Sequence, residues 1–184
     1  MNILINIKLI LILNTMENTV LFVRTGESHD TVLTDVGGIQ SRCVAKHITD
    51  MMTRNNIKTV NIYSSSEHRT IDTAICLVNK WDVPLNIRIP GYSSEYSKYS
   101  DTLLNTIMSE FEAKLKDASQ TPIIVYTNDK FINAILNSLN KTPENIEYCI
   151  HNCSISTIVY NTTSKEWNIE CVSDISHLGD NITY

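Results

Sequence analysis

Short runs of β-branched and aromatic residues alternate along the chain with longer segments in which apolar residues recur every three or four positions. The short runs predict strands at residues 20–23, 60–63, 123–126 and 155–159, and a weaker strand at 167–172. The longer segments predict amphipathic helices over 39–52, 103–115 and 131–139. Strands alternating with helices of this length predict an α/β fold: a three-layer α/β/α sandwich with a mainly parallel central sheet.

Polar residues directly follow three of the predicted strands, at 24–26, 64–65 and 127–128. In a parallel sheet, the carboxyl ends of the strands meet at one edge, where helix N-termini present N–H groups to anions. We therefore expect these separated segments to meet at one rim. The segment 90–100, rich in Ser and Tyr, predicts an irregular loop over that rim.

Length and composition fit one globular domain, with 184 residues of which 42% are hydrophobic and 19% charged. The net charge of -5 argues against nucleic acid as a main partner, because nucleic-acid binding usually requires a basic patch. Five cysteines without a Cys-x-x-Cys pair argue against a secreted disulfide scaffold and against a zinc site. We expect neither a metal nor a cofactor.

The N-terminal residues 3–13 are apolar apart from Asn6 and Lys8. This run is about half of the roughly 20 residues that span a bilayer, so a membrane span is not expected. A poor cleavage site and the lack of a preceding basic residue disfavour a secretory signal. We interpret residues 1–15 as an extension outside the fold and residues 16–184 as the domain, with the cytoplasm as the expected location. Targeting or anchoring by residues 1–15 stays open.

The strand-end segments resemble motifs of the histidine phosphatase superfamily, whose fold is that of the phosphoglycerate mutases. Arg24-Thr25-Gly26-Glu27 is similar to the family's Arg-His-Gly-Glu, and residues 33–40 are similar to its Leu-Thr-x-x-Gly-x-x-Gln. Residues 62–74 resemble a family segment with a second arginine, whose place Arg69 takes.

The resemblance continues to the end of the chain. Residues 123–129 stand where the family has an apolar strand ending in Ser-His-Gly, so that Asn128 replaces the second histidine. Residues 152–156, Asn-Cys-Ser-Ile-Ser, are similar to the opening of a later strand. The tail around residues 178–180 is most similar to the mitochondrial phosphoglycerate-mutase-like protein phosphatases.

The resemblance implies roles for these positions. In the family the first histidine is the nucleophile, the second histidine and two arginines hold the phosphate, and a glutamate supplies the leaving-group proton. Here Thr25 stands at the nucleophile position and Asn128 at that of the second histidine, while Arg24 and Arg69 keep the arginine positions. Glu95 is the best match to the acid, although an exposed loop residue is an equally good interpretation.

The expected phosphate-binding residues are thus Arg24, Arg69, Thr25 and Asn128, with no intact catalytic set. A threonine hydroxyl has a pKa far above neutral, and an asparagine amide cannot carry the charge of an imidazolium. The sequence therefore favours a catalytically inactive phosphatase-like protein that binds phosphate, a phosphorylated small molecule, a phosphoprotein, another protein or a second copy of itself.

Two alternatives stay open. One is an active phosphoric monoester hydrolase with a non-standard site, in which Glu95 or Glu27 activates water. The other is a purely structural subunit. His29 and His68 lie near the motifs in sequence but not at the strand end, so we interpret them as solvated, and we interpret His177 as structural.

Overall fold

The protein is described by a computed structural model, which covers residues 16–89, 99–116, 121–140 and 145–183. In chain order the elements are β1 (Thr19–Arg24), β2 (Ser28–His29), β3 (Val32–Leu33), α2 (Asp35–Arg54), β4 (Asn61–Ser65), α3 (His68–Trp81), β5 (Leu85–Ile89), α4 (Asp101–Leu115), β6 (Ile123–Thr127), α5 (Asp129–Leu139), β7 (Ile155–Asn161) and β8 (Glu166–Asp174).

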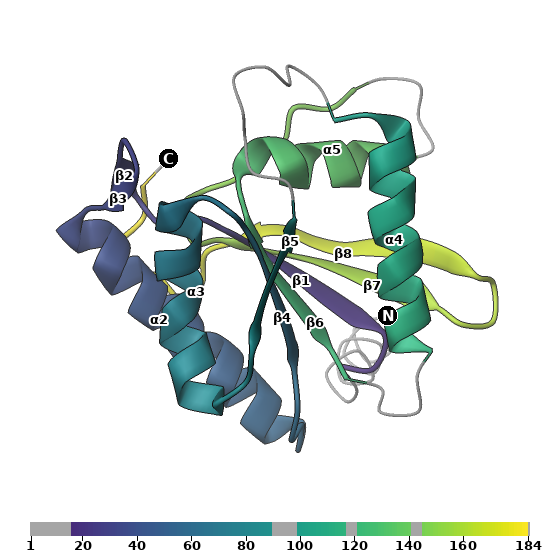
Figure 1. Ribbon diagram of the computed structural model, residues 1–184, viewed down its shortest axis with the longest axis horizontal. Coiled ribbons are helices and arrows are strands. Elements are labelled where there is room, and N and C mark those ends of the chain that lie inside the picture. Colours follow the sequence, from purple (N-terminus) through teal and green to yellow (C-terminus); the bar gives the residue numbers. More distant parts are fainter. Residues whose placement is uncertain (1–15, 90–98, 117–120, 141–144, 184) are drawn as a thin grey trace, which may run out of the picture.

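Six strands form one sheet in the order β5-β4-β6-β1-β7-β8 (Figure 1). Neighbours among β5, β4, β6 and β1 are parallel, whereas β7 and β8 add an antiparallel edge beside β1. The strands β2 and β3 form a separate short hairpin between β1 and α2. The predicted mainly parallel sheet is confirmed.

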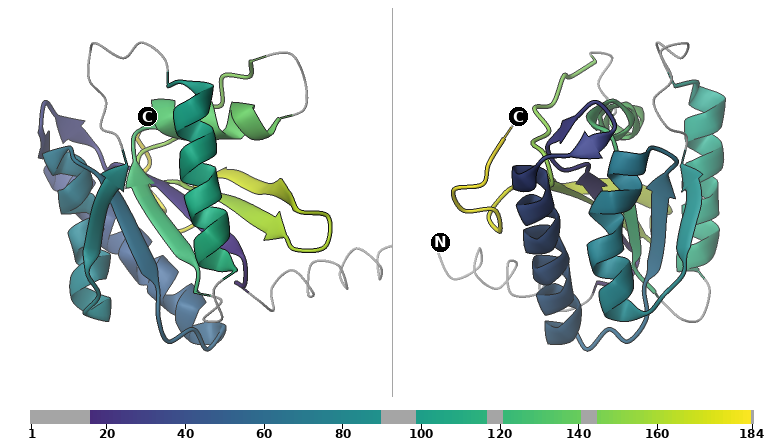
Figure 2. Two further views of the ribbon diagram at one scale, coloured as in Figure 1. Left: turned by 45° about the vertical axis from the view of Figure 1, so that its right-hand side comes forward. Right: turned by 60° about the vertical axis from the view of Figure 1, so that its left-hand side comes forward.

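Helices cover both faces of this sheet, α2 and α3 one face and α4 and α5 the other (Figure 2). Successive residues of β1 point alternately to the two sides. Val20 and Phe22 pack in the cluster with α4 and α5, and Leu21 and Val23 pack in the cluster with α2. The three-layer α/β/α sandwich expected from the sequence is therefore confirmed.

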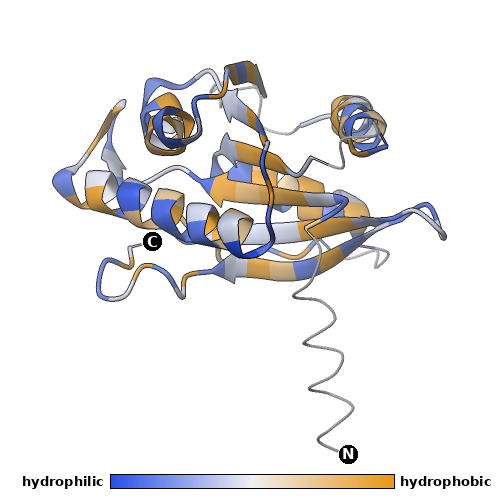
Figure 3. Cartoon of the chain, turned by 90° about the horizontal axis from the view of Figure 1, so that it is seen from below, coloured by the Kyte–Doolittle hydropathy of each residue, from blue (hydrophilic) through white to orange (hydrophobic). Residues whose placement is uncertain are grey.

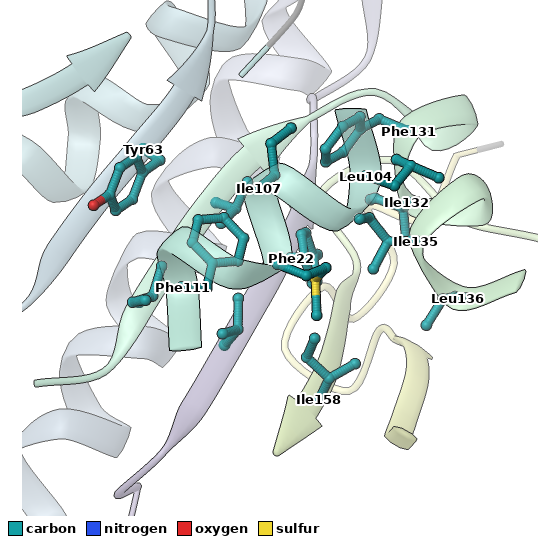
Figure 4. Close-up of a cluster of buried hydrophobic side chains, with 14 of the residues drawn as sticks. Phe22, Tyr63, Leu104, Ile107, Phe111, Phe131, Ile132, Ile135, Leu136 and Ile158 are labelled. Atoms are coloured by element: carbon teal, nitrogen blue, oxygen red, sulfur yellow. The ribbon is translucent and has the colours of Figure 1, made fainter. Parts of the chain in front are cut away.

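The central strands are buried on both faces, which explains why they are continuous apolar runs instead of alternating ones. All five residues of β6 are buried, as are the first five of β1. In Figure 3 the sheet is mostly hydrophobic, while the helices mix hydrophobic and hydrophilic positions. Figure 4 shows the core under α4, where Phe111 lies 6.3 Å from Phe22 and 5.6 Å from Tyr63 between ring centroids.

Three predicted helices and five predicted strands are present, with ends shifted by a few residues, whereas α3, β5 and the short strands β2 and β3 were not predicted. Within the described residues, none of the helices has the length and apolarity needed to cross a bilayer. The predictions for residues 1–15 and for most of the 90–100 loop lie outside the described residues, as does Glu95.

Candidate functional site

The segments that follow β1, β4 and β6 meet at the carboxyl edge of the sheet. Arg24 and Thr127 are register partners at the ends of β1 and β6. The Thr25 N–H donates to the Thr127 carbonyl oxygen over 2.9 Å, and the Gly26 N–H donates to Thr73 Oγ1 on α3 over 3.1 Å. The structure thus brings the strand-end segments together at the rim where the sequence places them.

Thr25, at the expected nucleophile position, is buried, with 6% of its surface exposed. Its Oγ1 lies 2.8 Å from Thr70 Oγ1 and 3.1 Å from the Thr127 carbonyl oxygen. Because a carbonyl only accepts, the Thr25 hydroxyl donates either to Thr127 or to Thr70. The side chain thereby links the loop after β1 to the first turn of α3 and to the end of β6.

Close packing between this loop and α2 explains Gly26 in the loop and Gly37 in the helix. A Cβ on Gly26 would lie 2.9 Å from the Gly37 carbonyl oxygen, and a Cβ on Gly37 would lie 2.0 Å from that of Glu27. Any larger residue at Gly37 would push the backbones apart. The N-terminus of α2 is therefore held directly against the loop that carries Thr25.

Arg24 is partly buried, and its Nη1 donates to the Ile150 carbonyl oxygen. Burial lowers the pKa of Arg24, an effect that the Asp129 carboxylate opposes and the Arg69 charge reinforces. Because an arginine pKa starts above 12, the guanidinium stays charged near neutral pH. The influence of Arg69 means that the two cations lie near enough to repel each other.

Arg69 is held by neighbours from two elements. Its Nη2 lies 3.3 Å from Glu67 Oε1, and its Nη1 lies 3.4 Å from Ser28 Oγ and from the Asp30 carbonyl oxygen. These contacts are at the long end of hydrogen-bond distances. The Arg69 guanidinium therefore has several partners, and none of these contacts is short.

Glu67 is a site residue that sequence reasoning missed. Its Oε2 lies 3.4 Å from Thr70 Oγ1 and 3.5 Å from Ser65 Oγ, and its other oxygen pairs with Arg69. The carboxylate therefore connects Arg69 to the Thr70–Thr25 pair. Glu67 is the residue before α3, and it makes no side-chain hydrogen bond that caps this helix. No signal in the sequence distinguishes it from a solvated helix-start residue.

Asn128, at the expected second-histidine position, is the N-cap of α5. Its Oδ1 accepts from the Phe131 N–H over 2.9 Å, and its Nδ2 donates to Tyr99 Oη over 3.3 Å. Both ends of the amide are therefore engaged, one in the helix and one with an aromatic side chain. Asn is a favoured N-cap residue, which accounts for this amino acid independently of any ligand.

Two buried hydroxyls lie beside Arg24. Thr127 is its register partner, and the Ser154 carbonyl oxygen accepts from the Arg24 N–H over 3.2 Å. Among the residues that the structure describes, neither Thr127 Oγ1 nor Ser154 Oγ has a hydrogen-bond partner. Buried polar groups without a partner are uncommon and often belong to a site that a ligand or water completes.

The other candidate residues lie apart from this arrangement. Glu27 uses Oε1 to accept from Thr34 Oγ1 over 2.8 Å, so it supports the start of α2. His29 and His68 are exposed, as expected for solvated residues. The ring of His177 contacts the Cys153 carbonyl oxygen over 2.9 Å.

Comparison with known proteins finds similarity in structure only. No protein-family model matches the sequence, and no curated protein matches it. A mycobacterial glucosyl-3-phosphoglycerate phosphatase in complex with inorganic phosphate superposes with a TM-score of 0.65 at 13% identity, over 85% of this chain and 97% of that one.

Two further solved structures are similar to the chain. A mutant phosphoserine phosphatase from Entamoeba histolytica, in complex with phosphoserine, has a TM-score of 0.67 at 16% identity, covering 87% of this chain and 98% of its own. YhfR from Bacillus stearothermophilus has a TM-score of 0.64 at 12% identity, with the same coverage. The chain therefore has the phosphoglycerate-mutase-like fold that these structures share.

Proposed function

We propose that this protein is a phosphate-binding domain without phosphatase chemistry, which holds a phosphate or a phosphorylated ligand between Arg24 and Arg69. The observation that carries the proposal is the state of Thr25. Its hydroxyl is buried and bonded to Thr70 and to the Thr127 carbonyl oxygen, at the position where the resemblance places the nucleophile.

Attack on phosphorus requires a nucleophile with a free lone pair and, for a hydroxyl, a base that removes its proton. The atoms bonded to the Thr25 hydroxyl are a carbonyl oxygen and another threonine hydroxyl, neither of which is a base at neutral pH. Asn128 is neutral and caps α5, so it adds no positive charge to a developing transition state. These features support a site that binds without reacting.

Binding itself is supported by the two arginines and the hydroxyls around them. A guanidinium binds two phosphate oxygens in a fixed fork, and both Arg24 and Arg69 belong to this rim. Thr127 Oγ1 and Ser154 Oγ lack partners among the described residues, but both are fully buried, so they would donate to an anion only after a local opening. An incoming anion must compete with Glu67 for Arg69, so we expect weak binding of inorganic phosphate.

A second candidate function is supported by the contact between Thr70 and Glu67. If Thr25 donates to Thr70, then Thr70 can donate to Glu67 Oε2 over 3.4 Å, and the three residues form a relay from hydroxyl to carboxylate. This would be the active hydrolase with a non-standard site, with Glu67 as the base. A carboxylate is a much weaker base than the alkoxide that it would have to create, which ranks this candidate second.

The binding proposal is tested by titrating inorganic phosphate into ¹⁵N-labelled protein. We expect shifts at residues 24–28 and 65–70, and a roughly 10-fold or larger loss of affinity in Arg69→Gln, because a hydrogen bond to a charged group contributes about 1.5–3 kcal/mol. Arg42→Gln, an exposed change on α2, is the matched control and should bind like wild type. Equal affinity in all three proteins would contradict the proposal.

A further inference from the structure

His47, Asp174 and His177 come together on the α2 side of the molecule. His47 lies on α2, Asp174 ends β8, and His177 lies in the segment after it. One ligand atom from each residue lies within 4.8 Å of the other two, and all three residues are half-buried. The two imidazole rings are tilted against each other, with centroids 4.9 Å apart and planes inclined by 30°.

The hydrogen bonding of His177 fixes which of its ring nitrogens is free. Nε2 lies 2.9 Å from the Cys153 carbonyl oxygen. A carbonyl only accepts, so Nε2 carries the proton and the lone pair of the neutral ring is on Nδ1. That Nδ1 is buried and has no hydrogen-bond partner within the described part of the chain. Metal-binding histidines are usually held in this way, with the second nitrogen donating to a carbonyl or carboxylate.

The Asp174 carboxylate is also oriented by hydrogen bonds. Its Oδ1 accepts from the Ser176 N–H over 2.9 Å, and its Oδ2 accepts from Ser176 Oγ over 3.2 Å. Each carboxylate oxygen can accept more than one contact, so both retain a free lone pair. Asp174 at the end of β8 and His177 in the turn after it are three residues apart in sequence. Both lie beside His47 on α2.

We propose that His47, Asp174 and His177 form a binding site for a divalent transition-metal ion, for which Zn²⁺ is the best fit. Two imidazoles and a carboxylate are ligands that Zn²⁺ accepts, with bonds of about 2.0–2.2 Å and water or another group in the fourth position. Ligand atoms in such a site are roughly 3.3 Å apart, so binding requires a modest closure of the three side chains.

Charges of both signs surround His47. The carboxylates of Asp174 and Asp50 favour a cation there, whereas the positive charges of Arg54 and Lys46 oppose it, and Lys46 is paired with Asp50 at 2.5 Å. Burial lowers the pKa of both His47 and His177, which supports neutral rings near pH 7. The sequence did not predict this site, because His47 is separated from Asp174 by most of the chain.

A metal at this position would fasten the C-terminal segment to α2. His177 bonds the carbonyl of Cys153, whose N–H in turn donates to the Arg24 carbonyl oxygen over 3.1 Å. Metal binding would therefore stabilise the backbone that supports Arg24. It would do so whether or not the rim binds phosphate.

The test is titration of Zn²⁺ and Co²⁺ into the full chain by calorimetry, in a buffer with a non-thiol reductant. We expect one ion per chain for wild type and for the control His29→Gln, whose side chain is 89% exposed. His177→Gln and His47→Gln should each bind about 10-fold more weakly or worse, because even the supporting partners of metal ligands are worth this much. Circular dichroism checks that each variant folds.

The free cysteines need their own control, because exposed thiols also bind Zn²⁺. Cys149 and Cys171 are exposed, and Cys149→Ser/Cys171→Ser should bind like wild type. Loss of binding in this double variant, or equal affinity of wild type and His47→Gln, would overturn the proposal. If His177→Gln fails to fold, His47→Gln and Asp174→Asn decide. In a long-range ¹H–¹⁵N spectrum, Zn²⁺ should move Nδ1 of His177 while Nε2 stays protonated.

Discussion

Thr25 Oγ1 lies 2.8 Å from Thr70 Oγ1, which joins the loop after β1 to the first turn of α3. The side chain at the position expected for the nucleophile thus holds two elements together. We therefore expect the Thr25 hydroxyl to contribute to stability, so that its removal lowers the free energy of unfolding.

Thr25→Val should therefore destabilise the protein by about 1–3 kcal/mol, because the change leaves buried hydrogen-bond partners unsatisfied. Thr25→Ser keeps the hydroxyl and should lose less. Urea denaturation measures both free energies of unfolding. Thr102→Val, at an exposed position on α4, is the control and should change stability by about 0.5 kcal/mol or less. A Thr25→Val protein as stable as wild type would contradict the bracing role.

Thr25→His alone should create almost no phosphatase activity. The position is buried against Thr70, so an imidazole has little room, and Asn128 still lacks a positive charge. Hydrolysis of p-nitrophenyl phosphate measures the outcome, with Thr25→His/Asn128→His as the companion variant. Strong activity in the single variant would mean that Asn128 already serves as an adequate phosphate ligand.

Substitutions of Asn128 should separate its capping role from ligand binding. Asn128→Ala removes the N-cap of α5 and should lower stability by about 0.5–2 kcal/mol. Asn128→Asp keeps a good cap and should stay close to wild type in stability, but its negative charge near the arginine rim should abolish phosphate binding. Thermal unfolding and phosphate titration of both variants measure the two effects. Unchanged phosphate affinity in Asn128→Asp would mean that phosphate does not bind near Asn128.

Cys153 should be the least reactive thiol of the native protein. It is fully buried, and burial raises its pKa to about 12, so hardly any thiolate forms at pH 8. We expect Cys149 to react quickly with Ellman's reagent and Cys153 to react only after unfolding, as mass spectrometry of the labelled peptides would show. Rapid labelling of native Cys153 would contradict the packing of the segment beneath Arg24.

The raised pKa of Cys153 predicts that the protein becomes less stable at alkaline pH. The pKa of Cys153 is higher in the folded than in the unfolded chain, so its contribution is complete below about pH 9 and is lost as the pH rises towards 12. Burial raises the pKa of Tyr126 too, and its contribution has the same sign. Urea denaturation between pH 8 and about pH 10 should show stability falling, with a shallower slope in Cys153→Ala.

The strands of the sheet could be predicted because their burial on both faces leaves an uninterrupted apolar run. α3 could not, because two of its four buried residues are Thr70 and Thr73, which hide the apolar period of its inner face. The burial of these threonines follows from their bonds to Thr25 and Gly26, which no local pattern reveals.

The location of the candidate site in the fold could be predicted from the sequence. The rule that parallel strand ends share an edge places Arg24, Thr25 and Asn128 together, and the structure agrees. The part played by Glu67 was not predictable, because it depends on the angle at which α3 leaves β4. The cluster around His47 depends in the same way on how the C-terminal segment returns to α2.

We propose that the segments around Arg24 and Arg69 bind phosphate without cleaving phosphate esters. The most direct test is a prolonged incubation of p-nitrophenyl phosphate with an excess of protein, comparing wild type with Thr25→Ala. We predict that both proteins release phosphate at the rate of buffer alone. A wild-type rate clearly above buffer would contradict this proposal, and its loss in a Thr25→Ala protein that circular dichroism shows to be folded would make Thr25 catalytic.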